Sequence, residues 1–342
     1  MCLALAGTWL EIAFLKKGKI SLLAGSVLCI GLAVILKMNC LIMGIGMLLC
    51  AVSMLRKKRF TGRTAVYCLL LLLAFLYGNR LVDTAVERAF HVPESDGIPM
   101  NSLIAMGLQD NVAGPGWWNS YSLDNFKESG YDSQIAAQNA NRRIVRQIEI
   151  LTENPVSGVR FFIKKFASGW NNPTYQGLGI LVGREGNYKE EWGKLAQTED
   201  GALLHNYMNL YHSVILAGCL LYLLYYRKKL NELNLLFPVI IMGGCVFHMF
   251  WEMKSVYILP YFIMLLPLSV IGYMEGFRAL NSRWDEIKAG RASEISTKRK
   301  LMIICGGVLL VLLLSQAERT ELFTKTIGLN ENQEAYEEIY YS

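Results

Sequence analysis

The sequence predicts an all-α integral membrane protein with about eight transmembrane helices and one large, mainly helical extracytoplasmic domain. Hydrophobic residues make up 53% of the 342 positions and charged residues only 18%. The apolar residues gather in blocks of membrane-spanning length, and basic residues gather in short segments between these blocks. One long polar stretch, from Asp83 to Leu204, interrupts the pattern and predicts the extracytoplasmic domain.

Each apolar block has about the 15 to 22 residues with which a helix crosses a hydrocarbon core. A helix satisfies its own backbone hydrogen bonds in lipid, so each block is predicted to be helical. The blocks are residues 1–15, 20–36, 38–55, 64–82, 205–226, 235–251, 256–274 and 301–315. We therefore expect transmembrane helices 1–4 in residues 1–82 and transmembrane helices 5–8 in residues 205–316. The extracytoplasmic domain occupies residues 83–204, and an acidic extracytoplasmic tail occupies residues 317–342.

Basic residues predict the orientation, because short loops rich in Lys and Arg stay on the cytoplasmic side. Basic clusters lie at residues 16–19, 56–63, 227–229 and 278–300. An even number of crossings must separate any two clusters, which predicts tight helical hairpins that turn at residues 37–40 and 252–255. The protein is then multi-pass in the cell membrane, with its long loop and C-terminus outside. The formal net charge of +6 is concentrated in these topology signals, so no nucleic-acid partner is predicted.

Several kinds of chemistry lack their sequence signals. None of the eight cysteines lies between Asp83 and Leu204, so no disulfide is predicted in the extracytoplasmic domain. The cysteines and the four histidines show no spacing typical of a metal site. No phosphate-binding glycine motif or nucleophile elbow is present. We therefore predict no metal, no cofactor and no ATP hydrolysis.

Two helices are predicted in the middle of the polar stretch. Asp132 or Ser133 is expected to cap the first, which continues to about Glu153. Its predicted apolar face consists of Ile135, Ile144, Ile148 and Leu151. The second begins near Pro155, a residue that favours the first turn of a helix.

The second helix has an apolar side at Val159, Phe162 and Phe166, which recur at helical spacing. Its other faces carry the basic residues Arg160, Lys164 and Lys165. This pattern predicts an interfacial helix with its apolar side toward lipid and its basic side toward headgroups. The alternative is an ordinary packed helix in a small domain.

The run Trp251-Glu252-Met253-Lys254-Ser255-Val256-Tyr257 places a carboxylate and an ammonium at the outer mouth of two helices. Charges at membrane depth usually face a cavity or a partner. Glu252 is a candidate for orienting sugar hydroxyls or transferring a proton, and Lys254 for neutralising a phosphate. Tyr257 is a candidate for stacking on a sugar ring. The alternative is a plain interfacial turn with two solvated charges.

Two further regions contribute candidate substrate-binding residues. Arg80, at the outer end of the fourth apolar block, suits phosphate recognition but also fits a side chain that snorkels to the interface. The segment from Met106 to Asp124 has no helix or strand periodicity and is rich in Gly, Trp and Asn. Trp117, Asn119 and Asp124 there are candidates for carbohydrate binding. The same residue types also occur in irregular packed loops.

Several of these segments together resemble the bacterial integral membrane glycosyltransferases of the GT-C superfamily, relatives of the dolichyl-phosphate-mannose-protein mannosyltransferases. The segments are IAMGL at 104–108, NSYSLD at 119–124, KKF at 164–166, WNNP at 170–173 and WEMKSVYILP at 251–260. The resemblance covers about two thirds of the chain and implies transfer of a sugar, by inverting attack, from a polyprenyl-phosphate donor to a cell-envelope acceptor on the outer face. Membrane lipid and the polyprenyl-phosphate sugar are then the expected partners.

The sequence departs from this family at the catalytic position. The family carries an acidic residue on its first outer loop, whereas this sequence starts inside a helix, and its Glu11 is predicted near the cytoplasmic side. The catalytic residue is therefore unknown. We expect the chain to be the C-terminal part of such an enzyme, which requires an N-terminal half or a partner subunit.

Two other functions remain open. The first is a non-enzymatic transporter, flippase or assembly partner for surface polysaccharide, which would require charged residues along a path through the membrane. The second is a polymerase or ligase of lipid-linked glycans, which would require several outer-face arginines, as at Arg142, Arg143 and Arg146.

Overall fold

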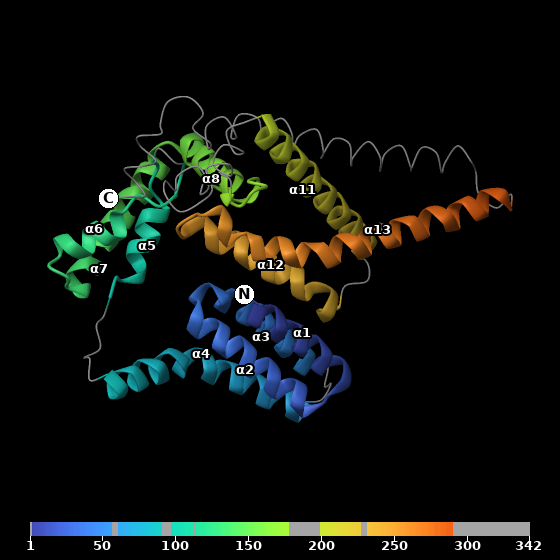
Figure 1. Cartoon of the computed structure of the whole chain (residues 1–342), viewed down its shortest axis with the longest axis horizontal. Helices are drawn as coiled ribbons and strands as arrows, with labels where there is room; N and C mark the ends of the chain where they lie inside the picture. Colours follow the sequence, from blue (N-terminus) through green and yellow to red (C-terminus); the bar gives the residue numbers. More distant parts are fainter. Residues whose placement is uncertain are drawn as a thin grey trace. The chain divides into compact units, whose positions relative to one another are not determined.

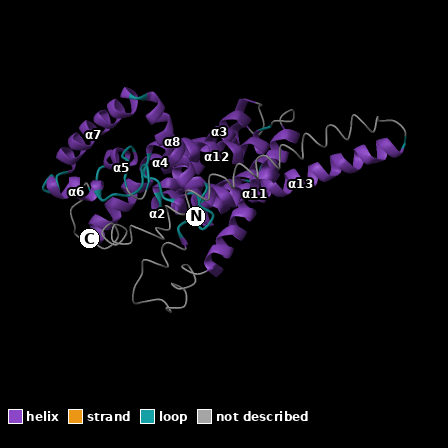
Figure 2. Cartoon of the chain, turned by 90° about the horizontal axis from the view of Figure 1, so that it is seen from above, coloured by secondary structure: helices purple, strands orange, loops and turns teal. Residues whose placement is uncertain are grey.

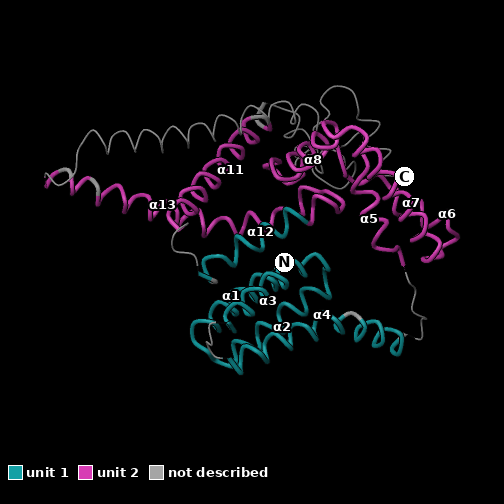
Figure 3. Tube along the Cα trace, turned by 180° about the vertical axis from the view of Figure 1, so that it is seen from behind, with its two compact units in different colours: residues 1–96, 228–246 teal, residues 97–227, 247–342 magenta. Residues whose placement is uncertain are grey.

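The computed structural model describes residues 2–56, 61–90, 97–111, 114–177, 199–226 and 231–289. Within these ranges the chain is helical and contains no β-strand, which confirms the predicted all-α class (Figure 2). The chain divides into two compact units, which Figure 3 shows in different colours. Unit 1 comprises residues 1–96 and 228–246, and unit 2 comprises residues 97–227 and 247–342.

Unit 1 begins with a series of apolar helices (Figure 1). They are α1 (Cys2–Lys17), α2 (Ile20–Leu36), the short 3-10 helix η1 (Met38–Cys40), α3 (Leu41–Arg56) and α4 (Thr61–Phe90). The extended backbone of Lys37 ends α2, so a break between helices is confirmed at residues 37–40. Helix α4 continues past Val82, where the predicted apolar block ended.

Buried polar side chains join the helices of unit 1. Ser26 Oγ donates a hydrogen bond to the Gly7 carbonyl over 2.8 Å and lies 2.9 Å from the Tyr67 hydroxyl. These contacts connect α1, α2 and α4. Glu11 is fully buried among the same helices.

Unit 2 contains the remaining described helices. They are α5 (Met100–Gly107), α6 (Tyr121–Glu128), α7 (Ser133–Glu153), α8 (Pro155–Trp170), α11 (Glu199–Tyr226), the end of α12 (Glu232–Phe250), the 3-10 helix η2 (Ser255–Tyr257) and α13 (Leu259–Lys288). The segment from Met106 to Asp124, predicted to lack helix, therefore begins in α5 and ends in α6. That prediction was wrong at both ends, because these helices are too short to show a clear period.

The predicted starts of α7 and α8 are confirmed. The Asp132 carboxylate accepts hydrogen bonds from the backbone N–H groups of Gln134 and Ile135, at 2.8 and 3.0 Å. Pro155 occupies the first turn of α8, and the Asn154 side chain caps it. These are the positions at which a helix has unpaired N–H groups.

The predicted apolar face of α7 is not its buried face. Ile135 and Ile148 are 48% and 49% exposed, whereas Ala136, Ala140 and Gln147 are buried. Helix α5 packs against α7, and the Asn101 side chain of α5 donates a hydrogen bond to the Ala137 carbonyl over 2.8 Å. The buried face of α7 is therefore set by its neighbour and not by its most hydrophobic residues.

Five helical segments in the described part of the chain are long and apolar enough to cross a membrane, which identifies a membrane protein. They are Met38–Arg56, Thr61–Gly78, Leu203–Tyr226, Leu233–Phe250 and Leu259–Glu286. Helix α2 is apolar but shorter. The predicted block at residues 301–315 and the acidic tail at 317–342 lie outside the described residues.

Helices α11 and α13 cross at two glycines in unit 2. A Cβ atom on Gly272 would lie 1.9 Å from the Gly218 carbonyl oxygen. Glycines allow two membrane helices to bring their backbones together, and dispersion contacts then stabilise the pair. This crossing positions α13, whose N-terminus follows the candidate site.

Candidate functional site

The candidate site is the turn that joins two membrane spans. The span Leu233–Phe250 ends just before it, and the span Leu259–Glu286 begins just after it. Residues 251–258 therefore connect two helices that are each long and apolar enough to cross a membrane. The helices are interrupted here, where the turn at residues 252–255 was predicted.

The side chain of Lys165 on α8 is fully buried beside this turn. Its Nζ atom donates hydrogen bonds to the carbonyl oxygens of Met249, at 2.9 Å, and Trp251, at 2.8 Å. It donates a third to the carbonyl oxygen of Gly107. A protonated lysine has three N–H donors, so the three carbonyls match its full capacity. The prediction that Lys165 lies on a headgroup-facing side of α8 was therefore wrong.

These carbonyls are free to accept because they lie at helix ends. Met249 and Trp251 are at the C-terminus of α12, and Gly107 is the last residue of α5. The last carbonyls of a helix have no intrahelical partner and carry the negative end of the helix dipole. Lys165 therefore caps two helix C-termini at once and joins α5, α8 and α12.

The ammonium charge of Lys165 is subject to opposing effects. Burial lowers the pKa of Lys165 to about 7, and the nearby Glu252 carboxylate opposes this shift. The three carbonyl acceptors also favour the charged form, because a neutral amine has one donor fewer. The three carbonyls and Glu252 thus act against the lowering of the pKa that burial causes.

A glycine loop closes over this lysine. Gly116 has a φ of +72°, and a Cβ atom there would lie 2.5 Å from the Gly107 carbonyl oxygen and 2.4 Å from Lys165 Cε. The Gly116 carbonyl accepts a hydrogen bond from the Met253 backbone N–H over 2.8 Å. The loop can therefore reach the turn only because this position has no side chain.

Trp117 and two serines extend the same network. The Trp117 indole N–H donates to the Ser168 hydroxyl over 2.8 Å, and the Ser255 hydroxyl donates to the Ser168 carbonyl over 3.2 Å. Trp117 is 1% exposed, so its ring faces are covered by protein. This burial supports the packed-loop interpretation of Trp117 over a direct contact with carbohydrate.

The charged pair of the turn lies next to this network. Lys254 Nζ is 2.8 Å from Glu252 Oε1, and their side chains are 24% and 7% exposed. Lys254 Nζ also lies 5.8 Å from the centre of the Trp118 ring and 5.9 Å from that of Tyr257. The buried carboxylate excludes the alternative of two solvated charges. The arrangement is an ion pair flanked by two aromatic rings.

The other predicted site residues lie elsewhere. The Asn119 amide donates to Gln109 Oε1 over 3.1 Å, and the exposed Asp124 accepts a hydrogen bond from Ser120. Arg80 belongs to unit 1, on α4, and its side chain is exposed. The structure therefore groups Glu252, Lys254 and Tyr257 with Trp118, a residue that the sequence did not single out.

Sequence reasoning missed the residues that hold the turn in place, chiefly Lys165, Ser168 and Gly116. A basic residue on an amphipathic helix ordinarily indicates an exposed side, so Lys165 gave the wrong signal. The available signal was the Gly-Pro-Gly run at residues 114–116, which is typical of a tight loop with close backbone contacts.

Compared with profiles of protein families, with curated protein sequences and with solved structures, the chain matches none.

Proposed function

We propose that the chain is of the membrane glycosyltransferase lineage and binds a polyprenyl-phosphate-linked sugar at the turn formed by residues 251–257. The reaction of that lineage transfers the sugar to a cell-envelope acceptor on the outer face. The proposal rests on the resemblance described above and on how the resembling segments are arranged.

The observation that supports the proposal most is the meeting of these segments at one side chain. Lys165, of the KKF segment, bonds to Gly107, of the IAMGL segment, and to Trp251, of the WEMKSVYILP segment. The bonded residues are 58 and 86 positions apart along the chain. Short motifs that resemble a family by chance are not expected to contact one another in the folded chain. Motifs that form one site are expected to do so.

The chemistry of the turn fits a phosphate-linked sugar at a membrane surface. Lys254 is partly exposed, so its ammonium can turn from Glu252 toward a phosphate oxygen. The Glu252 carboxylate is then free to accept hydrogen bonds from sugar hydroxyls. The rings of Trp118 and Tyr257 offer apolar faces for the sugar. In this arrangement the ion pair holds both groups in place until the donor arrives.

The polymerase or ligase alternative has weaker support. Arg146 forms an ion pair with Glu149 on the same helix, and Arg143 lies 6.0 Å from the centre of the Tyr121 ring. Both arginines are exposed on α7 and engage residues outside the turn. A pyrophosphate site would require them to converge, so the transferase lineage is favoured.

A binding measurement tests the proposal. The full chain in nanodiscs is titrated with a polyprenyl-phosphate-linked sugar and, separately, with plain polyprenyl phosphate. We expect Lys254→Ala to weaken binding of both lipids by about tenfold to a hundredfold, the value of one charge-assisted phosphate contact. Glu252→Gln should weaken only the sugar-linked lipid, because its neutral amide oxygen accepts weaker hydrogen bonds from sugar hydroxyls than the carboxylate does, and the Lys254 ammonium remains.

Lys127→Ala serves as the matched control, since Lys127 is exposed on α6. It should bind both lipids as the parent chain does. Saturable binding that survives unchanged in Lys254→Ala and Glu252→Gln would remove the turn as the donor site. Equal affinity of the parent chain for the two lipids would contradict sugar recognition.

A further inference from the structure

Helix α8 presents an apolar stripe to its surroundings. Val156, Val159, Ile163 and Phe166 are 71%, 60%, 57% and 38% exposed. Successive residues of an α-helix are about 100° apart around its axis, so these four side chains lie within about 80° of arc. They form one continuous surface, which we call the α8 stripe.

The neighbouring helix α7 lacks such a stripe. Its large exposed apolar residues are Ile135, Val145, Ile148 and Ile150. By the same helical geometry they are spread over about 200° of arc. Scattered apolar side chains are normal on a solvated surface, whereas a continuous stripe indicates a contact with something apolar.

The contacts of Lys165 fix α8 at the level of the membrane surface. This side chain bonds to the carbonyls of Met249 and Trp251, which lie at the end of the span Leu233–Phe250. Ser168, nearly one turn further along α8, accepts a hydrogen bond at its carbonyl from Ser255, just before the span that begins at Leu259. The stripe therefore belongs to a helix that is bonded to the ends of two membrane spans.

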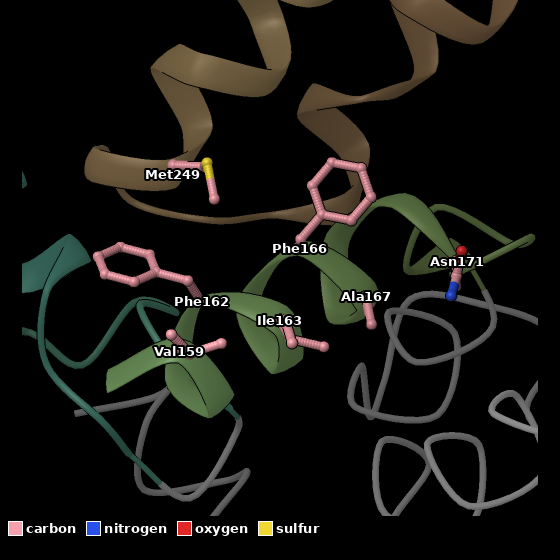
Figure 4. A pocket seen from close by; sticks show the side chains of 7 residues that line it. All are labelled: Val159, Phe162, Ile163, Phe166, Ala167, Asn171 and Met249. Atoms are coloured by element: carbon pink, nitrogen blue, oxygen red, sulfur yellow. The ribbon is translucent and has the colours of Figure 1, made fainter. Parts of the chain in front are cut away.

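A groove beside the stripe is also apolar. It has a volume of about 470 Å³ and is lined by Val159, Phe162, Ile163, Phe166, Ala167, Asn171 and Met249. Figure 4 shows Phe162 and Phe166 on α8 and Met249 on the adjoining helix. Apart from one asparagine the lining carries no polar side chain, so the groove suits a hydrocarbon chain.

Basic residues lie along the edge of the α8 stripe that is farther from Phe162. Arg160 and Lys164 are exposed, and by helical geometry they follow the stripe around the axis, on the side away from Phe162. A helix at a membrane interface places its apolar side among the acyl chains and its basic residues among anionic headgroups. Arg160 and Lys164 supply that charge complementarity.

We propose that α8 lies on the surface of the bilayer, with the α8 stripe and its groove among the acyl chains and with Arg160 and Lys164 bound to anionic lipid headgroups. The buried Lys165, on another side of α8, holds the helix at the level of the span ends through its hydrogen bonds to Met249 and Trp251. The proposal concerns a lipid contact of the whole chain and does not depend on a sugar donor.

A fluorescence measurement tests this contact. An environment-sensitive fluorescent amino acid replaces Ile163 in the full chain, which is reconstituted into vesicles whose lipids carry bromine on the acyl chains. The matched control replaces Val145 on α7, since both residues are 57% exposed. We expect bromine to quench the probe at position 163 at least about twofold and to leave the probe at position 145 unquenched.

Three further results bear on the proposal. The double variant Arg160→Glu, Lys164→Glu should reduce quenching at position 163 in vesicles that contain phosphatidylglycerol and change it little in pure phosphatidylcholine. Equal quenching at positions 163 and 145 would overturn the proposal. A blue-shifted but unquenched probe at position 163 would also overturn it, because a protein surface, from a second copy or a partner, would then cover the stripe.

Discussion

Replacement of Lys165 by Met tests how much of the unit 2 structure depends on one ammonium group. Methionine retains much of the side-chain length but leaves the carbonyls of Gly107, Met249 and Trp251 without this donor. A buried acceptor without a partner costs about 1–3 kcal/mol. Removal of a buried ammonium offsets part of this loss, because its desolvation costs several kcal/mol. We expect a net destabilisation of about 2–4 kcal/mol.

Thermal unfolding of the purified full chain in one detergent measures this loss. Lys164→Met is the matched control, because Lys164 is adjacent in sequence and exposed. The control should stay within about 0.5 kcal/mol of the parent chain, while Lys165→Met lowers the melting temperature by about 3–6 °C. Equal shifts in the two variants would refute the assignment of Lys165 as a cap of two helices.

The pH dependence of the same pair of proteins tests the charge of Lys165. Its folded pKa of about 7 is below the ordinary lysine value, so between these values the unfolded chain binds more protons than the folded chain. The stability of the parent relative to Lys165→Met should therefore rise as pH increases above 7 and level off near the ordinary lysine pKa. A flat difference across this window would show that the three carbonyls restore the pKa to its ordinary value.

Two glycine replacements test the close backbone contacts. Gly116→Ala should destabilise the chain by more than about 2 kcal/mol in the same thermal assay, since its Cβ meets a backbone carbonyl at 2.5 Å. Gly130 is the matched control, because it has a similar φ of +66° and open space around it. Gly130→Ala should therefore cost only about 1 kcal/mol of backbone strain. Equal losses of stability in the two variants would contradict the close contact between Gly116 and the Gly107 carbonyl. Gly272→Ala should separate α11 from α13 and lower the melting temperature strongly. Gly276→Ala should not lower the melting temperature strongly, because its Cβ would make only ordinary contacts. If Gly272→Ala were equally well tolerated, the close crossing of α11 and α13 would be refuted.

Local signals in the sequence predicted the local features of the fold well. Asp132 and Pro155 mark helix starts because capping involves only residues a few positions apart. The turn at residues 37–40 was predicted because it separates two apolar blocks, each a helix. Such features depend on residues a few positions apart, so a single sequence is enough to predict them.

Features that depend on distant partners were not predictable in this way. The buried face of α7 is decided by its contact with α5, which lies across a loop and another helix. Lys164 and Lys165 are adjacent and chemically identical, yet one is exposed and the other is fully buried. Only the arrangement of α5 and α12 around α8 distinguishes them. The predicted residues Glu252, Lys254 and Tyr257 do group together, because they share one short turn.

The position of Lys165 links the two surfaces on which the proposals rest. Its carbonyl partner Trp251 immediately precedes Glu252, and the Gly116 loop that closes over it continues through Trp117 to Trp118. Glu252 of the ion pair and the flanking Trp118 thus lie one and two residues from positions that contact Lys165. The same side chain bonds α8 to the end of the span Leu233–Phe250, and the α8 stripe is the surface that we propose meets lipid. Together with the bond from the Ser255 hydroxyl to the Ser168 carbonyl, the Lys165 ammonium connects α8 directly to the turn.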